Sequence, residues 1–326
     1  MSWNIPLCTN GFPAPLAGTL PTAFKVSKID LYWAALTVGR PNLRTVLRHK
    51  QFSIYEAIWR IGMINANLDL SSPMVGLYHS SAFNALDPTE KGWVNFSLGM
   101  VFAKICAAKF LSIAWLMHFK WFQARNIVTM LPGGSTPDFI GVSARSGQHH
   151  VIEAKGRNSG FSQAVLDEAK AQATQAVSVN GSPCGLHVGT LMYRMGKTRI
   201  AMAMEDPKPE DRPKIELIDT RETWREYYET VWQLARLAGD DRAAFKRLTG
   251  LEIEFEERAR TSIESIMTGD HDDWQSARDE LIKSSGDESI VDDRVVRDKS
   301  RGSSTYPDGV RIIYTEPMAT RLGGSE

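Results

Sequence analysis

The chain has 326 residues, 43% of them hydrophobic, with 38 basic and 38 acidic side chains, which is enough to bury a substantial core in one large domain or two. Its three cysteines have no paired spacing, and no signal peptide or uncharged bilayer-length apolar run is visible, which argues against a disulfide framework, a zinc ribbon and a membrane span. We therefore expect a cytoplasmic protein without a membrane partner.

Residues 1–86 are expected to form a mainly helical N-terminal region. Four prolines make residues 1–28 irregular, whereas apolar side chains at helical spacing predict helices over 29–38 and 42–68. Residues 44–50 carry three cations and a histidine. Such a cluster could contact a phosphate backbone, although a solvated helix face explains it equally simply.

Residues 87–206 alternate between helix and strand patterns. Residues 86–119 are apolar on most sides, which predicts one long buried helix or two. The segments after them have strand or helix character in a regular order: strands at 125–131, 138–144 and 149–154, a helix that begins near Ser162, and a strand hairpin formed by 186–194 and 199–205.

The strands at 138–144 and 149–154 carry the residues that point to chemistry. Asp138 stands near the start of the first, and Glu153-Ala154-Lys155 ends the second. A hairpin turn between them would bring Asp138 beside Glu153, and alternation along the strand places Glu153 and Lys155 on one face. Two carboxylates and an ammonium would then meet at one end of the sheet. Magnesium prefers such an oxygen-rich arrangement.

This pattern resembles the PD-(D/E)XK nuclease superfamily, in which Pro-Asp is followed, after a short strand and a turn, by Asp or Glu, any residue and Lys. Here Pro137-Asp138 is followed after fourteen residues by Glu153-Ala154-Lys155. The resemblance spans 90–205, about a third of the chain. It implies an α/β fold with a restriction-endonuclease-like core of helix, three-stranded meander, helix and strand at 87–206, flanked by N- and C-terminal helical regions.

The resemblance also implies an activity, that of a metal-dependent nuclease hydrolysing phosphodiester bonds. A DNA endonuclease in restriction or phage defence is the most natural setting for a large free-standing member. Asp138, Glu153 and the Ala154 carbonyl would hold Mg²⁺, with Mn²⁺ as a substitute, and Lys155 would orient or deprotonate the attacking water. A second Pro-Asp, at Pro307-Asp308, has no such partner downstream.

Two candidates lie outside the motif. A helix before the core sheet sometimes supplies a further acidic metal ligand, and Glu90 is the candidate here, although the helix dipole also favours Glu in a first turn. Several members carry a glutamine after the Lys as a further catalytic residue. Gln172 is the candidate and Lys170 the alternative. His149 shares a strand face with the motif, where a structural histidine is the commoner role.

The triplet at 196–198 does not form a nucleotide-binding loop, because the glycine required five residues earlier is missing and a strand follows. Its neighbours Arg194 and Arg199, with Lys197, are candidates for contacts with substrate phosphates.

The rest of the chain is predicted to be an acidic helical C-terminal region at 207–283 and a flexible tail at 284–326. Helix patterns cover 220–238, 240–248, 251–267 and 272–283, and the run VRIIYTE in the tail could add an edge strand. The charge is uneven: residues 1–204 hold 19 Lys plus Arg against nine Asp plus Glu, and the remainder holds 19 against 29.

This charge distribution suggests that the basic part binds an anion such as a phosphodiester, although solvated helix faces also vary in charge. The resemblance implies DNA as the partner. The C-terminal helices could mediate a homodimer or bind a partner protein. The alternative is a catalytically inactive nuclease fold that serves as a nucleic-acid-binding or protein-interaction subunit of a larger complex.

Overall fold

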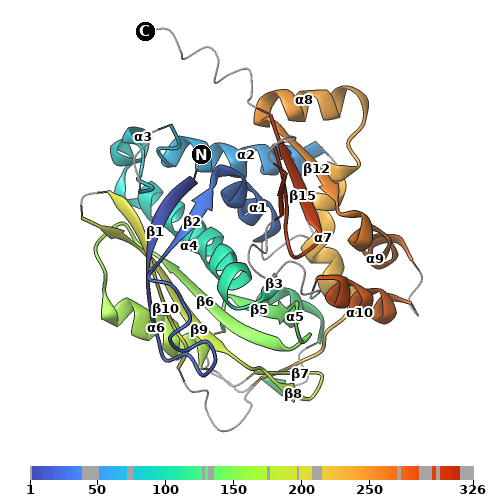
Figure 1. Ribbon diagram of the computed structural model, residues 1–326, viewed down its shortest axis with the longest axis horizontal. Coiled ribbons are helices and arrows are strands. Elements are labelled where there is room, and N and C mark those ends of the chain that lie inside the picture. Colours follow the sequence, from blue (N-terminus) through green and yellow to red (C-terminus); the bar gives the residue numbers. More distant parts are fainter. Residues whose placement is uncertain are drawn as a thin grey trace.

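The computed structural model describes residues 2–38, 51–71, 76–126, 129–130, 136–174, 177–196, 198–207, 215–269, 273–285, 296–298 and 302–315. The basic cluster at 44–50 and Lys197 lie outside these residues. Within them the fold is mixed α/β, with helices packed around a central sheet (Figure 1). No helix of this described part is both long and apolar enough to cross a membrane.

The central sheet has seven strands in the order β2-β1-β10-β9-β6-β5-β3. These strands are β1 (Ser2–Asn10), β2 (Ala23–Ser27), β3 (Ile113–His118), β5 (Phe139–Ser143), β6 (His149–Gly156), β9 (His187–Met195) and β10 (Arg199–Glu205). The pairs β1–β10 and β6–β9 are parallel, and the other pairs are antiparallel. Every residue of β3 and β5 is buried, because both faces of the sheet are covered.

Two helices cover opposite faces of β6, and they are α4 (Pro88–Phe110) and α6 (Gln163–Ala173). A Cβ atom added at Gly156 would lie 1.8 Å from the carbonyl oxygen of Asn95 in α4. Lys155, the residue before it, instead contacts Gln172 of α6. Because adjacent strand residues point to opposite faces, α4 and α6 lie on either side of the sheet.

Eight further helices and two small sheets surround this centre. The helices are α1 (Lys28–Val38), α2 (Gln51–Asn67), α3 (Ser81–Ala85), α5 (Phe119–Asn126), α7 (Arg221–Ala235), α8 (Gly239–Thr249), α9 (Glu257–Thr268) and α10 (Trp274–Ser285) within the described chain. One small sheet contains β4 (Thr129–Met130), β11 (Ile215–Leu217), β7 (Val177–Val179) and β8 (Ser182–Pro183). The other contains β12 (Leu251–Phe255), β15 (Val310–Tyr314), β14 (Ser303–Thr305) and β13 (Val296–Asp298), and β12 and β15 gather with α7 to α10 at one side of the central sheet (Figure 1).

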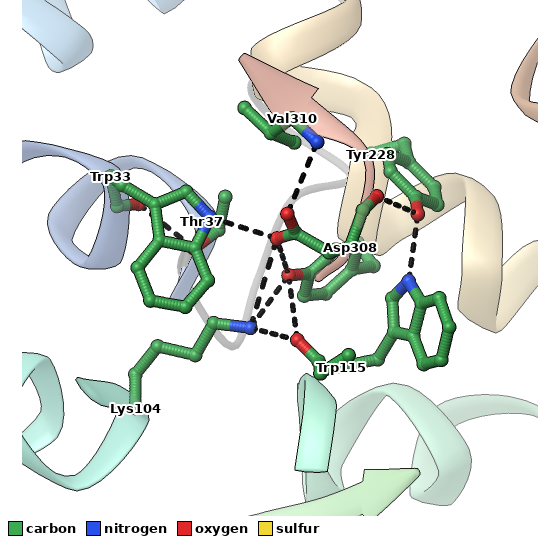
Figure 2. A network of polar contacts seen from close by, with 9 residues as sticks. Trp33, Thr37, Lys104, Trp115, Tyr228, Asp308 and Val310 are labelled. Carbon is green, nitrogen blue, oxygen red and sulfur yellow. Dashed lines mark hydrogen bonds and ion pairs between the residues drawn. The ribbon is translucent and has the colours of Figure 1, made fainter. Parts of the chain in front are cut away.

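A buried polar network joins the C-terminal sheet to the centre (Figure 2). Lys104 of α4 and Asp308, in the turn before β15, are both fully buried, with their charged groups 3.8 Å apart. Asp308 accepts hydrogen bonds from the Trp33 indole N–H (2.9 Å) and the Tyr227 hydroxyl, which itself accepts one from Lys104 (2.7 Å). Tyr228 donates to the Asp308 carbonyl (2.7 Å). The turn at Asp308 is thereby tied to α1, α4 and α7.

The structure confirms the two hairpins predicted in the middle of the chain. The first is β5–β6, whose turn contains Gly147 at a φ of 68°, and the second is β9–β10, whose turn contains Gly196 at a φ of 65°. A positive φ suits glycine in both turns, because glycine has no Cβ atom to clash. The structure also confirms the helix predicted at 29–38, which is α1.

The one or two helices predicted over 86–119 are wrong in the last part of this segment. The helix α4 ends at Phe110, Ser112 turns the chain at a φ of 59°, and β3 follows. Since β3 is apolar on both faces, its sequence has no period that separates it from a buried helix. The meander is therefore β3-β5-β6. The strand predicted at 125–131 is confirmed only for β4 at Thr129–Met130 among the described residues, since α5 runs to Asn126, and β4 belongs to another sheet.

The expectations for the two ends of the chain also need correction. Residues 1–28 are not irregular, because β1 and β2 belong to the central sheet and most of the prolines fall in the connection between them. The predicted helix at 251–267 begins with β12, whose burial alternates as in a strand. The predicted flexible tail contains β14 and β15, and β15 lies between β12 and β14 rather than at an edge.

Candidate active site

Asp138 and Glu153 are linked by reciprocal hydrogen bonds at the point where β5 begins and β6 ends. The Asp138 N–H donates to Glu153 Oε2 (2.8 Å), and the Ala154 N–H donates to Asp138 Oδ2 (3.2 Å). Each carboxylate is thus held by the backbone beside the other. The hairpin register produces this pairing, because Phe139 is aligned with Ile152.

Lys155 completes the group from the same face of β6. Its ammonium lies 2.9 Å from Glu153 Oε1 and donates a hydrogen bond to Gln172 Oε1. Glu168, one helical turn before Gln172 on α6, lies 3.6 Å from the same ammonium. The structure therefore brings together Asp138, Glu153, Lys155 and Gln172, as the sequence predicted.

Helix α6 can reach this group because β9 carries a glycine opposite Glu153. Gly189 is paired with Glu153 in the sheet, and a Cβ atom at this position would lie 2.9 Å from the backbone nitrogen of Lys170. A larger residue at position 189 would push α6, and Gln172 with it, away from Lys155. The next residue of β9, Thr190, donates a hydrogen bond from its hydroxyl to the Glu153 main-chain carbonyl (3.0 Å).

Burial and neighbouring charges shift the pKa values of Asp138, Glu153 and Lys155. Burial, and then the negative charge of Asp138, raise the pKa of Glu153 to about 7. Burial also raises the pKa of Asp138, against the opposing effects of the Ala154 N–H and the Lys155 charge. Burial disfavours the ammonium of Lys155, but the carboxylates around it outweigh this effect and raise its pKa.

Other residues considered from the sequence lie apart from this group. The Glu90 carboxylate accepts a hydrogen bond from the Asp87 N–H (3.3 Å) in the capping box that opens α4. Lys170 pairs with Glu205 (2.6 Å) instead of turning toward Lys155. His149 lies 3.6 Å from Asp219, which precedes α7. None of their contacts in the described chain joins Asp138 or Glu153.

Sequence reasoning missed Glu168, although a signal for it was present. Glu168 and Gln172 are four residues apart in a helix, so a helix that presents one of them to Lys155 also presents the other. Both contact the Lys155 ammonium. The second Pro-Asp, which lacks the rest of the motif, has a structural place instead: its Asp308 is the buried centre of the network in Figure 2.

The donor atoms suit a hard divalent cation. Asp138 and Glu153 offer carboxylate oxygens, and the Ala154 carbonyl points to the same side as its N–H, toward Asp138, because both groups of a strand residue face one neighbour. Among the described residues, no cluster of three or more His, Cys, Asp or Glu side chains is arranged as metal ligands. No family model, no curated protein and no solved structure matches this chain.

Proposed function

We propose that this protein is a metal-dependent nuclease that hydrolyses phosphodiester bonds, with DNA as the substrate. One observation carries the proposal: a buried and a half-buried carboxylate, a lysine and a glutamine converge where β5 begins and β6 ends, beside α6. Water-mediated phosphodiester cleavage needs oxygen ligands for a divalent cation and a positive charge near the phosphate. The setting of restriction or phage defence stays a prediction.

The chain's own residues have separate tasks in this proposal. Asp138, Glu153 and the Ala154 carbonyl would hold Mg²⁺ or Mn²⁺, which when bound supplies Lewis acidity and lowers the pKa of a coordinated water. Lys155 places its ammonium beside the carboxylates, where it offsets negative charge on the phosphate and orients the attacking water. Gln172 and Glu168 fix the direction of the Lys155 side chain.

The test is incubation of the purified protein with supercoiled plasmid in Mg²⁺, in Mn²⁺ and in chelator. We expect cleavage with either metal and none in chelator. Asp138→Asn should lower the rate by about a thousandfold, because it removes one of the two carboxylates that would hold the metal ion. The matched control is Asp167→Asn, since Asp167 is an exposed carboxylate on α6 whose contacts are Gln163 and Lys170.

Two results would remove the proposal. One is unchanged cleavage by Asp138→Asn, which would indicate a contaminating nuclease or a different site. The other is the absence of cleavage of duplex, single-stranded and RNA substrates by a folded wild-type protein with either metal. Circular dichroism and the melting temperature of each variant establish that the protein is folded.

A further inference from the structure

Three buried side-chain atoms without a hydrogen-bond partner lie just beyond the ends of β6 and β9 within the described chain. They are Arg157 Nη1, Asn158 Oδ1 and Arg194 Nε. His79 and Asn95 are also buried, and their side chains interact with each other near Arg194. A buried polar atom without a partner costs free energy, so such a concentration indicates a group from outside the chain.

These residues come from different elements that meet at one place. The backbone N–H of Arg157 donates to Met192 (3.0 Å), and that of Arg194 donates to Ser159 (2.9 Å), so the loop after β6 runs along the end of β9. Asn95 of α4 packs on Gly156, the last residue of β6. Arg157 is the first residue after β6, two residues after Lys155, whereas Asn95 and Arg194 lie on the face of the sheet opposite to Lys155.

His79 joins the cluster from the segment before α3. Its backbone N–H donates to the Thr198 carbonyl (3.1 Å), which places it beside the turn between β9 and β10. Burial, and then the positive charge of Arg194, lower the pKa of His79 to about 4. The imidazole is therefore neutral at physiological pH, with one nitrogen able to donate and the other able to accept.

The cluster holds positive charge that the described chain does not neutralise. Arg157 donates through Nε to the Ser159 hydroxyl (2.7 Å), and neither Arg157 nor Arg194 has a carboxylate of the described chain within ion-pair distance. A partly buried guanidinium without a counter-ion is costly, whereas its planar array of N–H donors matches phosphate oxygens.

We propose that Arg157, Arg194 and His79 bind a phosphate group of the nucleic acid strand where it passes the ends of β6 and β9, away from the phosphate that is cleaved. This subsite rests on the proposed function, because it assigns the second phosphate of the same substrate. Arg157 follows Lys155 by two residues and lies directly after the end of β6, so one nucleic acid backbone can pass both side chains. Such a contact positions the strand and carries no information about base sequence.

The experiment uses Arg194→Met and Arg157→Met, which keep the length of the side chain and remove its charge. The matched control is Arg145→Met, because Arg145 is exposed in the turn at the opposite end of β6. The first measurement is the melting temperature in inorganic phosphate against chloride at constant ionic strength. We expect phosphate to raise the melting temperature of the wild type and Arg145→Met by a few degrees, and that of the two other variants by much less.

The second measurement is binding of a fluorescent duplex oligonucleotide in chelator, so that no cleavage occurs. Each of the two variants should bind about tenfold more weakly than wild type, and the slope of log K against log salt should fall by about one. Cleavage in Mg²⁺ should show a raised KM with an unchanged kcat.

The outcomes separate the possible sources of the phosphate. If inorganic phosphate stabilises the wild type through Arg194 but oligonucleotide binding is the same in all variants, the site takes a free anion and the proposal is overturned. Equal behaviour of Arg194→Met, Arg157→Met and Arg145→Met in both assays also overturns it. If the wild type binds DNA through Arg194 and never cleaves it, the nuclease proposal fails and the phosphate subsite stands.

Discussion

Glu153 is restrained from three directions, and this restraint decides what the site can do. The Asp138 N–H and the Lys155 ammonium each hold one of its carboxylate oxygens, and the Thr190 hydroxyl holds its main-chain carbonyl. A side chain fixed in this way loses little conformational entropy when a substrate arrives. Replacement of any one partner changes the direction of the carboxylate as well as its charge.

His150 gives a stability prediction at the same scale. It is buried, and its Nδ1 accepts a hydrogen bond from the Leu186 N–H (2.9 Å). Burial, and then the neighbouring imidazoles, lower its pKa from 6.5 to about 4. Between these pH values the unfolded chain binds a proton that the folded chain does not bind, so the free energy of unfolding falls as the pH is lowered.

His150→Asn should remove this dependence, because the Asn carbonyl can accept from Leu186 and does not titrate. Below pH 6.5 the wild-type free energy of unfolding should fall more steeply than that of the variant, by up to about 1.4 kcal/mol per pH unit. Urea unfolding at several pH values measures the two curves. At pH 8 both proteins are neutral at this position and the difference should be constant. Parallel curves down to pH 4 would contradict the prediction.

At the scale of elements, the contact between α4 and β6 depends on a residue without a side chain. A Cβ atom at Gly156 would lie 1.8 Å from the backbone oxygen of Asn95, and neither the strand nor the helix can shift easily. Gly156→Ala should therefore cost about 3 kcal/mol. Gly92→Ala in α4 is the control, because nothing lies within 4 Å of the Cβ position at residue 92. This substitution should stabilise the protein by about 0.5–1 kcal/mol.

Chemical denaturation of Gly156→Ala and Gly92→Ala measures the free energy of unfolding of each variant against the wild type. A Gly156→Ala protein as stable as the wild type would show that the helix and the strand can separate without cost.

The network in Figure 2 leads to a second prediction for the elements. Lys104→Met leaves the Asp308 carboxylate buried without its cation, which should cost about 3–5 kcal/mol. Lys91→Met is the matched control, since Lys91 is a half-buried lysine of α4 whose ammonium contacts a backbone carbonyl and no buried carboxylate. Its effect should stay within about 0.5 kcal/mol. Equal midpoints for the two variants in urea would show that the buried pair contributes nothing.

The elements that could be predicted from the sequence are those whose signal is local. Alternating side chains and turn glycines identified β5–β6 and β9–β10, and the same hairpin logic placed Asp138 beside Glu153. The strand β3 could not be found in this way, because it is buried on both faces. Asp308 could not either, since its burial depends on partners such as Trp33, which is 275 residues away in the chain.

At the scale of the whole molecule, segments from the two ends of the chain complete the same structure. Leu7 of β1 is aligned with Met202 of β10, and Asp308 is bound by Trp33 of α1. A chain that ends at residue 301 lacks β14, β15 and Asp308, and it leaves Lys104 buried without a counter-ion. We expect it to show helical circular dichroism, to bind a hydrophobic dye and to lack a cooperative melting transition. A sharp transition near that of the full chain would contradict this.

The parallel pairing of β1 with β10 also constrains how the protein is made. The strand β1 is translated long before β10, the strand beside which it must lie. Until then β1 can pair with β2 alone, and its other edge stays open to unrelated chains. Nascent chains stalled before β10 should therefore be digested readily by proteases, and resistance should develop only once synthesis has passed Asp308.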